Sequence, residues 1–132
     1  MPNLNKMEVL LFDNRIDQAL MIEEMLKKIG CRVSLVMIEY DCFAKLINGG
    51  YDMVLFDHSI SGLDVPGFVN QLEIIDRSMS VAMMVTLPSR FYEDKYGCTG
   101  VDFLIFKPFG YTELLFLVKE AFQYSQKFKK AS

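Results

Sequence analysis

The sequence predicts an α/β fold: a doubly wound, five-stranded parallel sheet in the order 2-1-3-4-5 with helices on both faces. Short, nearly continuous apolar segments alternate along the chain with longer segments in which apolar residues recur every three or four positions. Continuous apolar runs are typical of parallel strands that are covered on both faces. The alternation therefore indicates right-handed strand-helix-strand units, for which this strand order is a common arrangement in small domains.

Five segments have the composition of buried strands. The first runs from Met7 to Phe12, and Glu8 is its only charged residue. The other four are 32–38, 53–56, 81–85 and 103–106. Short turns separate each strand from the helical segment that follows it, as the predicted alternation requires.

The first helix has the clearest apolar stripe. Ala19, Ile22, Leu26 and Ile29 fall at intervals that place them on one face of a helix. Gly30 follows this stripe, at the position where a helix end favours a left-handed residue. We therefore expect the helix to end at this glycine.

Four further helices are expected along the rest of the chain. The first of them is short, begins at a cap provided by Asp41 and ends at the 48–50 turn. A poorly patterned helix is expected at 90–96, and the last helix begins near Tyr111. The residues predicted to be buried in these helices are Phe43, Leu46 and Ile47; Val65, Phe68, Val69, Leu72 and Ile75; and Leu115, Val118 and Phe122.

Length and composition favour a single soluble domain over residues 1–132. The chain has 132 residues, of which 52% are hydrophobic and 23% are charged, and no apolar run is long enough for a membrane span. The start lacks an apolar signal segment, so we expect a cytoplasmic protein. The net charge of -3 argues against nucleic acid as a partner, and the basic tail, about 124–132, is interpreted as a solvated helix end.

The cysteines do not suggest a disulfide framework or a structural zinc site. There are three, Cys31, Cys42 and Cys98, and no two of them have the Cys-x-x-Cys spacing. We expect small buried or half-buried thiols and no intramolecular disulfide.

Four polar residues follow the ends of four predicted strands. Asp13 follows the first strand, Asp57 the third, Thr86 the fourth and Lys107 the fifth. Because the carboxyl ends of parallel strands meet at one edge of the sheet, we expect these side chains within about 10 Å of one another. Each of these residues alone could have a structural role, such as a helix cap for Asp13. A structural role does not require all four to lie at one edge, so their convergence indicates a functional site.

This combination favours phosphoryl acceptance on Asp57. Two carboxylates form a hard oxygen patch suited to Mg²⁺, which would offset their repulsion of a phosphoryl donor. Asp57 is the expected nucleophile and would form an acyl phosphate. The Lys107 ammonium and the Thr86 hydroxyl are the expected partners of the phosphoryl oxygens.

The chain resembles the response-regulator receiver domains of the chemotaxis-regulator (CheY-like) type over nearly its whole length. The strand ends are separated by 44, 29 and 21 residues, which is similar to the spacing in that family. The resemblance implies a flavodoxin-like fold, Asp57 as phosphoacceptor, Asp13 as a metal-site acid, and a cis peptide bond between Lys107 and Pro108. The matching stretches are 9–13, 51–57, 83–86 and 106–109.

Three residues depart from the family pattern. Asn14 stands where the family usually has a second acid, so we expect only a weak Mg²⁺ site, formed by Asp13, Asp57 and the backbone carbonyl of Ser59, with Asn14 as a weak ligand. Leu87 replaces a small residue and is expected to restrict access to Asp57. Leu104 replaces the usual switch aromatic, which puts the usual aromatic motion in doubt.

Two other features have both a structural and a functional interpretation. His58 follows Asp57, but strand geometry is expected to turn its side chain away, which favours a structural role. Aromatic residues gather around the predicted fourth helix, fifth strand and fifth helix, where receivers usually contact partners. An exposed aromatic patch is expected there, drawn from Phe91, Tyr92, Tyr96, Phe103, Tyr111 and Phe116.

The favoured function is a stand-alone receiver of a two-component phosphorelay. It would take a phosphoryl group from a histidine kinase or phosphotransfer protein and signal through the face just described, with at most self-catalysed phosphorylation and dephosphorylation. The main alternative is a degenerate receiver that binds its partner without phosphorylation, which Asn14, Leu87 and Leu104 favour. A phosphotransferase or phosphatase is disfavoured, because the second acid of an Asp-x-Asp motif is replaced by Ser59, and a flavin or nucleotide site lacks a glycine-rich turn.

Overall fold

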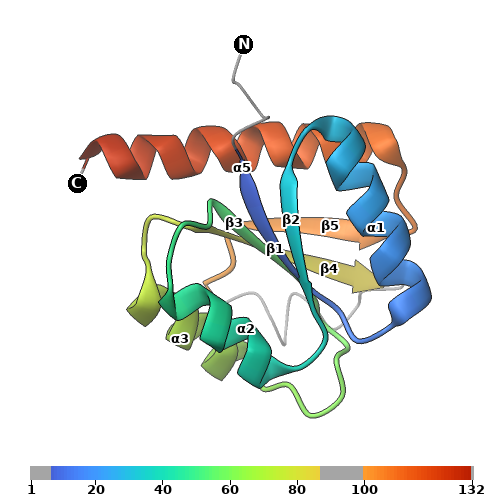
Figure 1. Cartoon of the computed structure of the whole chain (residues 1–132), viewed down its shortest axis with the longest axis horizontal. Helices are drawn as coiled ribbons and strands as arrows, with labels where there is room; N and C mark the ends of the chain where they lie inside the picture. Colours follow the sequence, from blue (N-terminus) through green and yellow to red (C-terminus); the bar gives the residue numbers. More distant parts are fainter. Residues whose placement is uncertain (1–6, 87–99, 132) are drawn as a thin grey trace.

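The computed structural model describes residues 7–86 and 100–131, which form a five-stranded, all-parallel sheet in the order β2-β1-β3-β4-β5 (Figure 1). The predicted fold class and strand order are therefore confirmed. The helix predicted at 90–96 lies outside the described residues. The strands are β1 Glu8–Phe12, β2 Arg32–Val36, β3 Met53–Asp57, β4 Ser80–Thr86 and β5 Phe103–Lys107, and the described helices are α1 Ile16–Ile29, α2 Glu39–Ile47, α3 Val65–Ile75 and α5 Tyr111–Ala131.

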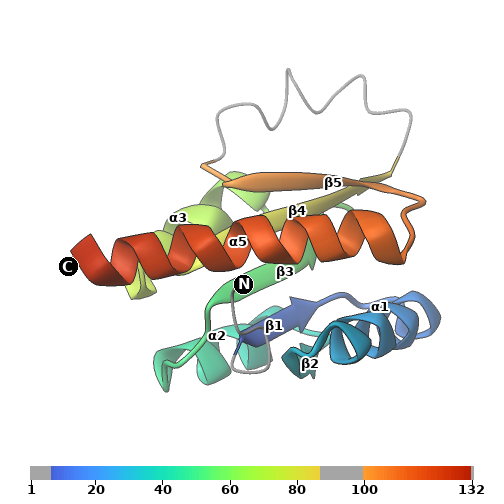
Figure 2. The ribbon, with the colours of Figure 1, turned by 90° about the horizontal axis from the view of Figure 1, so that it is seen from above.

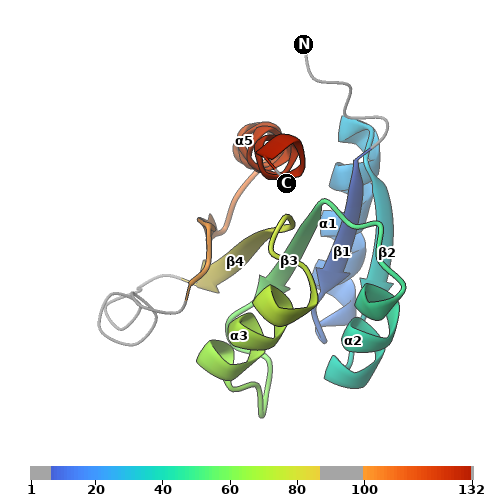
Figure 3. The same cartoon turned by 90° about the vertical axis from the view of Figure 1, so that its left-hand side faces the viewer.

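The helices form two layers around the sheet. Figures 1 and 3 show α2 and α3 together on one face, and α1 and α5 on the other. Successive residues of β1 supply the two cores in turn, because strand side chains alternate between faces. Leu10 and Phe12 pack with α2 and α3, whereas Val9 and Leu11 pack with α1 and α5. Both faces of the sheet are thus buried, as the continuous apolar runs predicted.

Helix α1 follows the sequence prediction closely. Ala19, Ile22 and Leu26 are buried, and Gly30 ends the helix in the left-handed region with φ 115°. The Gly30 N–H donates to the carbonyl oxygens of Leu26 and Lys27, which lack helical partners at this end.

The predicted start of the second helix is wrong. Helix α2 begins at Glu39, so Asp41 lies in its first turn instead of capping it. Ile47, which was predicted to be buried, is 73% exposed, whereas Cys42 and Leu46 are buried. The helix therefore turns Cys42, and not Ile47, toward the sheet, because buried residues four apart share one helix face.

The predicted stripe of the last helix is also partly wrong. Leu115 and Phe122 are half-buried, and the buried apolar positions are Leu114, Leu117, Val118 and Ala121. Figure 2 shows α5 as one long helix alongside β5. Residues 124–131 continue this helix, so most of the predicted basic tail is helical. Within the described residues, no helix combines the length and the apolar character that a membrane span needs.

Two of the three cysteines are free and buried, as predicted. Cys31 packs with α1 and α5, and Cys42 packs on the opposite face of the sheet. Burial raises the pKa of each thiol to about 12, so both are protonated at neutral pH. Cys98 lies outside the described residues.

Two carboxylates connect strands at the amino edge of the sheet. Asp52 Oδ2 accepts the Glu8 backbone N–H at 2.8 Å, and Asp102 Oδ2 accepts the Val81 N–H at 2.8 Å. These bonds join the segments before β3 and β5 to the neighbouring strands β1 and β4. They help to fix the register that brings the opposite strand ends together.

The core between the sheet and α3 centres on Phe68, which is 2% exposed. Its ring centroid lies 5.5 Å from those of Phe12 and Phe43 and 5.0 Å from that of Phe56. We predict that Phe68→Ala lowers the free energy of unfolding by about 3–5 kcal/mol through lost burial and a residual cavity. Denaturant unfolding measures this change. The matched control, Phe116→Ala, should cost less than about 0.5 kcal/mol, because Phe116 is 68% exposed; equal losses in both variants would contradict the predicted packing.

Candidate functional site

The four residues predicted to converge lie at the carboxyl ends of four strands. Asp13 directly follows β1, and Asp57, Thr86 and Lys107 are the last residues of β3, β4 and β5. Thr86 and Lys107 are direct partners in the register of the two neighbouring strands. Because all the strands are parallel, the four residues share one edge of the sheet.

Lys107 connects the acids of the site. Its ammonium nitrogen lies 2.5 Å from Asp57 Oδ2 and 3.5 Å from Asp13 Oδ2. The two carboxylate oxygens are therefore at most about 6 Å apart, the sum of these distances. The ammonium also donates to Gln18 Oε1 of α1 at 2.9 Å. A single cation thus lies within ion-pair distance of two buried carboxylates from different parts of the sheet edge.

Asp57 is held as a carboxylate although only 1% of its side chain is exposed. Its Oδ1 accepts the Ser59 N–H at 2.7 Å and the Ser59 hydroxyl at 2.5 Å, and its Oδ2 accepts a proton of Lys107. Burial favours the neutral acid, but these hydrogen bonds and the Lys107 charge outweigh it and hold the pKa of Asp57 below its ordinary value. The side chain is therefore ionised at neutral pH, which is the form a nucleophile needs.

Asp13 has one oxygen in a hydrogen bond and one without. Its Oδ1 accepts the backbone N–H of Arg15 at 3.0 Å. Its Oδ2 is buried, and no donor among the described residues forms a hydrogen bond with it. A buried anionic oxygen in this condition suits a hard cation such as Mg²⁺. The described part of the chain has no group of three acidic, histidine or cysteine ligands, so carbonyl oxygens and water would have to complete the coordination.

Thr86 is exposed and, with Lys107 and residues of α1, lines a cavity of about 340 Å³. Its backbone N–H donates to His58 Nε2 at 3.2 Å. Because Nε2 accepts this bond, the proton of a neutral His58 ring lies on Nδ1. The predicted structural role of His58 agrees with this contact, which ties the segment after β3 to the end of β4.

The three departures from the family pattern have different positions. Asn14 is exposed at the rim, directly after Asp13. Leu104 is half-buried and packs against the core on the α2 and α3 face. Leu87, the predicted gate, lies outside the described residues.

Three parts of the site were not predicted from the sequence. These are the Ser59 hydroxyl, the Gln18 amide and the Arg15 guanidinium, which donates to Ser59 Oγ at 3.0 Å. For Ser59, the sequence predicted a metal contact only through the backbone carbonyl. Arg15 and Gln18 lie in the segment after β1, close enough in sequence to Asp13 to be candidates, but nothing in a single sequence states which way their long side chains extend.

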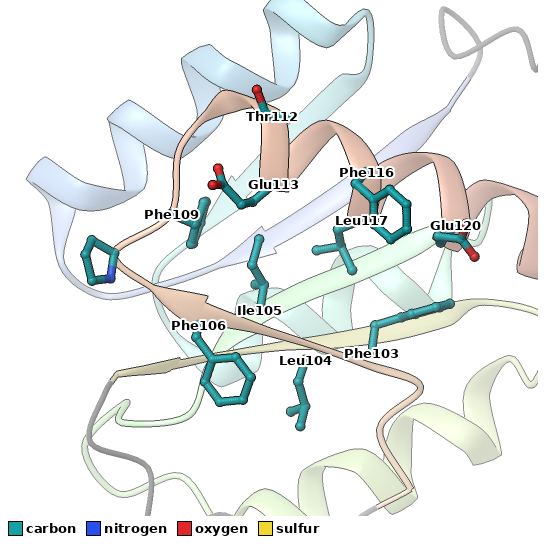
Figure 4. Close-up of a pocket in the computed structure, with 11 residues that line it drawn as sticks. Phe103, Leu104, Ile105, Phe106, Phe109, Thr112, Glu113, Phe116, Leu117 and Glu120 are labelled. Atoms are coloured by element: carbon teal, nitrogen blue, oxygen red, sulfur yellow. The ribbon is translucent and has the colours of Figure 1, made fainter.

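A second hollow lies between β5 and α5, with a volume of about 530 Å³. Figure 4 shows Ile105 and Leu117 between these elements, whereas Leu104 and Phe106 project from the other side of β5. Phe116, at 68% exposure, and Tyr111, at 43%, are the exposed aromatics of this face. Phe103 is half-buried. The predicted aromatic patch is thus present in part, and Phe91, Tyr92 and Tyr96 lie outside the described residues.

Comparison with known proteins gives one curated relative. No family model matches the chain. The chain is similar to hybrid signal transduction histidine kinase L of Dictyostelium discoideum, with 28% identity over 123 residues. The match covers 86% of this chain but only 7% of that relative, so the chain spans a small part of its length.

Solved structures show the fold over nearly the whole chain. A CheY-like response regulator receiver domain protein from Methanospirillum hungatei has a TM-score of 0.81 at 20% identity, covering 92% of this chain and 97% of its own. A receiver domain from Clostridium thermocellum has a TM-score of 0.83 at 14% identity, covering 92% and 98%.

A third structure is the receiver domain of a sensor histidine kinase from Pseudomonas aeruginosa, with a magnesium ion coordinated in its active-site cleft. Its TM-score is 0.80 at 21% identity, and the match covers 89% of this chain and 98% of that one. Together with the sheet order, these matches show that the chain has the fold of the response-regulator receiver (CheY-like) domains, which its strand-end motifs predicted.

Proposed function

We propose that this chain is a receiver that accepts a phosphoryl group on Asp57 and transmits the signal to a protein partner. The observation that carries the proposal is the buried Asp57 carboxylate, which is ionised and bonded to Lys107 at the carboxyl edge of the sheet. Such a carboxylate is a competent nucleophile beside a cation that can balance the charge of the incoming group.

The reaction needs little beyond positioning and charge balance. An Asp57 oxygen attacks the phosphorus, and the bond from phosphorus to the donor breaks, with its electron pair leaving on the donor. In a histidine donor this pair returns to the imidazole nitrogen. Lys107 neutralises charge on the phosphoryl oxygens, and the Thr86 hydroxyl, at the end of the neighbouring strand, is a further donor.

The residues present fit a magnesium ion at this site. Asp13 would contribute its Oδ2, Asp57 an oxygen and Ser59 its backbone carbonyl, with Asn14 as a weak neutral ligand. When bound, Mg²⁺ supplies positive charge to the phosphoryl oxygens. Because Asn14 brings no charge, this site has one carboxylate fewer than the family pattern, and weak binding follows.

The proposed partners are a histidine kinase or phosphotransfer protein as donor and a downstream protein on the face that includes β5 and α5. The exposed Phe116 and the hollow beside it support this face as an interaction surface. A cytoplasmic location, a stand-alone receiver and the absence of nucleic acid as a partner stay predictions from the sequence.

The second candidate is a receiver that binds its partner without phosphorylation. Asn14 favours it, since an amide in place of a carboxylate weakens the metal site. The intact arrangement of Asp57, Asp13 and Lys107 favours phosphorylation instead, because a module that only binds partners has no need for buried carboxylates.

Phosphorylation of Asp57 is the direct test. We predict that incubation with Mg²⁺ and a small acyl phosphate gives an acid-stable, base-labile phosphate adduct, because Asp57 is held ionised beside Lys107. Intact mass and peptide mapping identify the adduct. Asp57→Asn should give none, and the control Asp41→Asn, an exposed change in α2, should match the wild type. A wild-type protein that acquires no adduct would favour the second candidate.

Asn14→Asp tests the metal site. The added carboxylate should raise Mg²⁺ affinity by about tenfold, because it places a further negative charge beside the ion. Calorimetric titration measures both affinities. Asn70→Asp adds the same charge at an exposed position of α3 and should leave the affinity unchanged. Equal affinities in the wild type and Asn14→Asp would show that the second acid position is not next to a metal.

A further inference from the structure

Arg15 joins the two loops that carry the acids. Its backbone N–H donates to Asp13 Oδ1 at 3.0 Å, and its guanidinium donates to Ser59 Oγ at 3.0 Å. The Ser59 hydroxyl in turn donates to Asp57 Oδ1 at 2.5 Å. The guanidinium nitrogen is therefore at most about 5.5 Å from the Asp57 carboxylate, the sum of the two side-chain distances.

The formal charges of Asp13, Asp57, Lys107 and Arg15 cancel without a metal. Asp13 and Asp57 contribute two negative charges, and Lys107 contributes one positive charge. Arg15 contributes the second positive charge, because a guanidinium stays protonated under all ordinary conditions. Asn14 is uncharged. A site with a second acid at position 14 and no arginine would carry two net negative charges and would need a divalent cation before an anion could enter.

The two cations also line the same cavity. Arg15, Lys107 and Thr86 border the hollow of about 340 Å³, together with Gln18. The rest of its lining is apolar: Met21, Ile22, Met25, Pro108 and Phe109. An anionic group that enters this hollow therefore meets a guanidinium and an ammonium, and the ammonium contacts Asp57. Guanidinium groups bind phosphoryl oxygens through two parallel N–H bonds, which a lysine does not offer.

We propose that Arg15 is a second phosphate-binding cation of this site, which holds the incoming phosphoryl group opposite Lys107 and makes transfer to Asp57 largely independent of Mg²⁺. The inference rests on the proposed function. The covalent step is unchanged: the bond from Asp57 oxygen to phosphorus forms, the bond from phosphorus to the donor breaks, and the electron pair leaves with the donor, which is a carboxylate when the donor is an acyl phosphate.

The loss of Arg15 should have opposite effects on two quantities, the rate of phosphoryl transfer and the affinity for Mg²⁺. Arg15 assists the phosphoryl group, so its loss should slow transfer most when Mg²⁺ is absent. Arg15 also repels a divalent cation, so its loss should tighten Mg²⁺ binding. A residue that only stabilises the loop would not produce both effects.

The test compares Arg15→Gln with the wild type. We expect the wild type to take phosphate from a small acyl phosphate in the presence of a chelator at no less than about one tenth of its rate at saturating Mg²⁺. In the presence of the chelator, Arg15→Gln should be phosphorylated about tenfold or more slowly than the wild type. At saturating Mg²⁺ it should be slower by no more than about threefold. Its Mg²⁺ affinity, measured by calorimetry without any donor, should rise by about threefold to tenfold.

Two further variants sharpen the comparison. Arg32→Gln is the matched control, because it removes the same charge from an arginine that pairs with Glu8 at the opposite edge of the sheet. Neither the phosphorylation rate in the presence of the chelator nor the Mg²⁺ affinity should change in this variant. Arg15→Lys keeps the charge but not the paired N–H bonds. It should keep the low Mg²⁺ affinity and recover only part of the metal-free rate.

The outcomes separate this inference from the proposed function. Equal Mg²⁺ affinities for the wild type and Arg15→Gln would overturn the inference. Equal phosphorylation rates of these two proteins in the presence of the chelator would also overturn it. If no protein acquires phosphate at any Mg²⁺ concentration, the proposed function fails, and the inference that Arg15 assists transfer fails with it. A working wild type whose metal-free transfer is absent would overturn the inference alone.

Discussion

A carboxylate with 1% of its side chain exposed is stable as an anion only if nearby groups replace the water it has lost, and at Asp57 these groups are Lys107 and Ser59. The position of Lys107 beside Asp57 in turn depends on how three strands of the sheet are paired. Lys107 meets Asp57 across the intervening strand β4, so the contact depends on the register of β3, β4 and β5. A shift of β5 by one residue would turn the ammonium to the other face. The apolar core, by fixing that register, also fixes the ionised state of Asp57.

The second constraint is the balance of charge around this pair. Two carboxylates at most about 6 Å apart repel each other by roughly 3 kcal/mol or more at an effective dielectric near 20, and Lys107 lies within 4 Å of both. Arg15 is attached to the same acids through its own backbone and through Ser59. The loop after β1 thus combines an asparagine in place of an acid with an arginine over the rim. Both residues make the local charge more positive, which favours the binding of an anion.

The sequence predicted the fold well because the evidence for it is distributed over many residues. Continuous apolar runs and helical stripes each involve a whole segment, so errors at single positions, such as Ile47 or Leu115, leave the architecture unchanged. The strand-end residues were predictable for the same reason, since parallel topology places them at one edge whatever their side chains do. Arg15 was not, because the direction of a long, exposed side chain depends on contacts that are distant in sequence. The one-residue shift on α5 has a local cause: Leu114 and Leu115 are both apolar, and only packing against the sheet selects between them.

The free-energy cost of burying charged groups at this site helps to choose between the two candidate functions. Replacing buried ionic groups with apolar residues of similar size is often neutral or stabilising, because the attraction between buried charges rarely exceeds their desolvation penalty. Asp13 has a buried oxygen whose nearest cation, Lys107, is 3.5 Å away and closer to Asp57. A domain that only bound a partner through β5 and α5 would lose little stability if both acids and Lys107 were replaced by apolar residues. The acids lie within ion-pair distance of Lys107, and Arg15 donates to the serine that donates to Asp57. This arrangement is better explained by a site that binds an anion and a cation than by a scaffold.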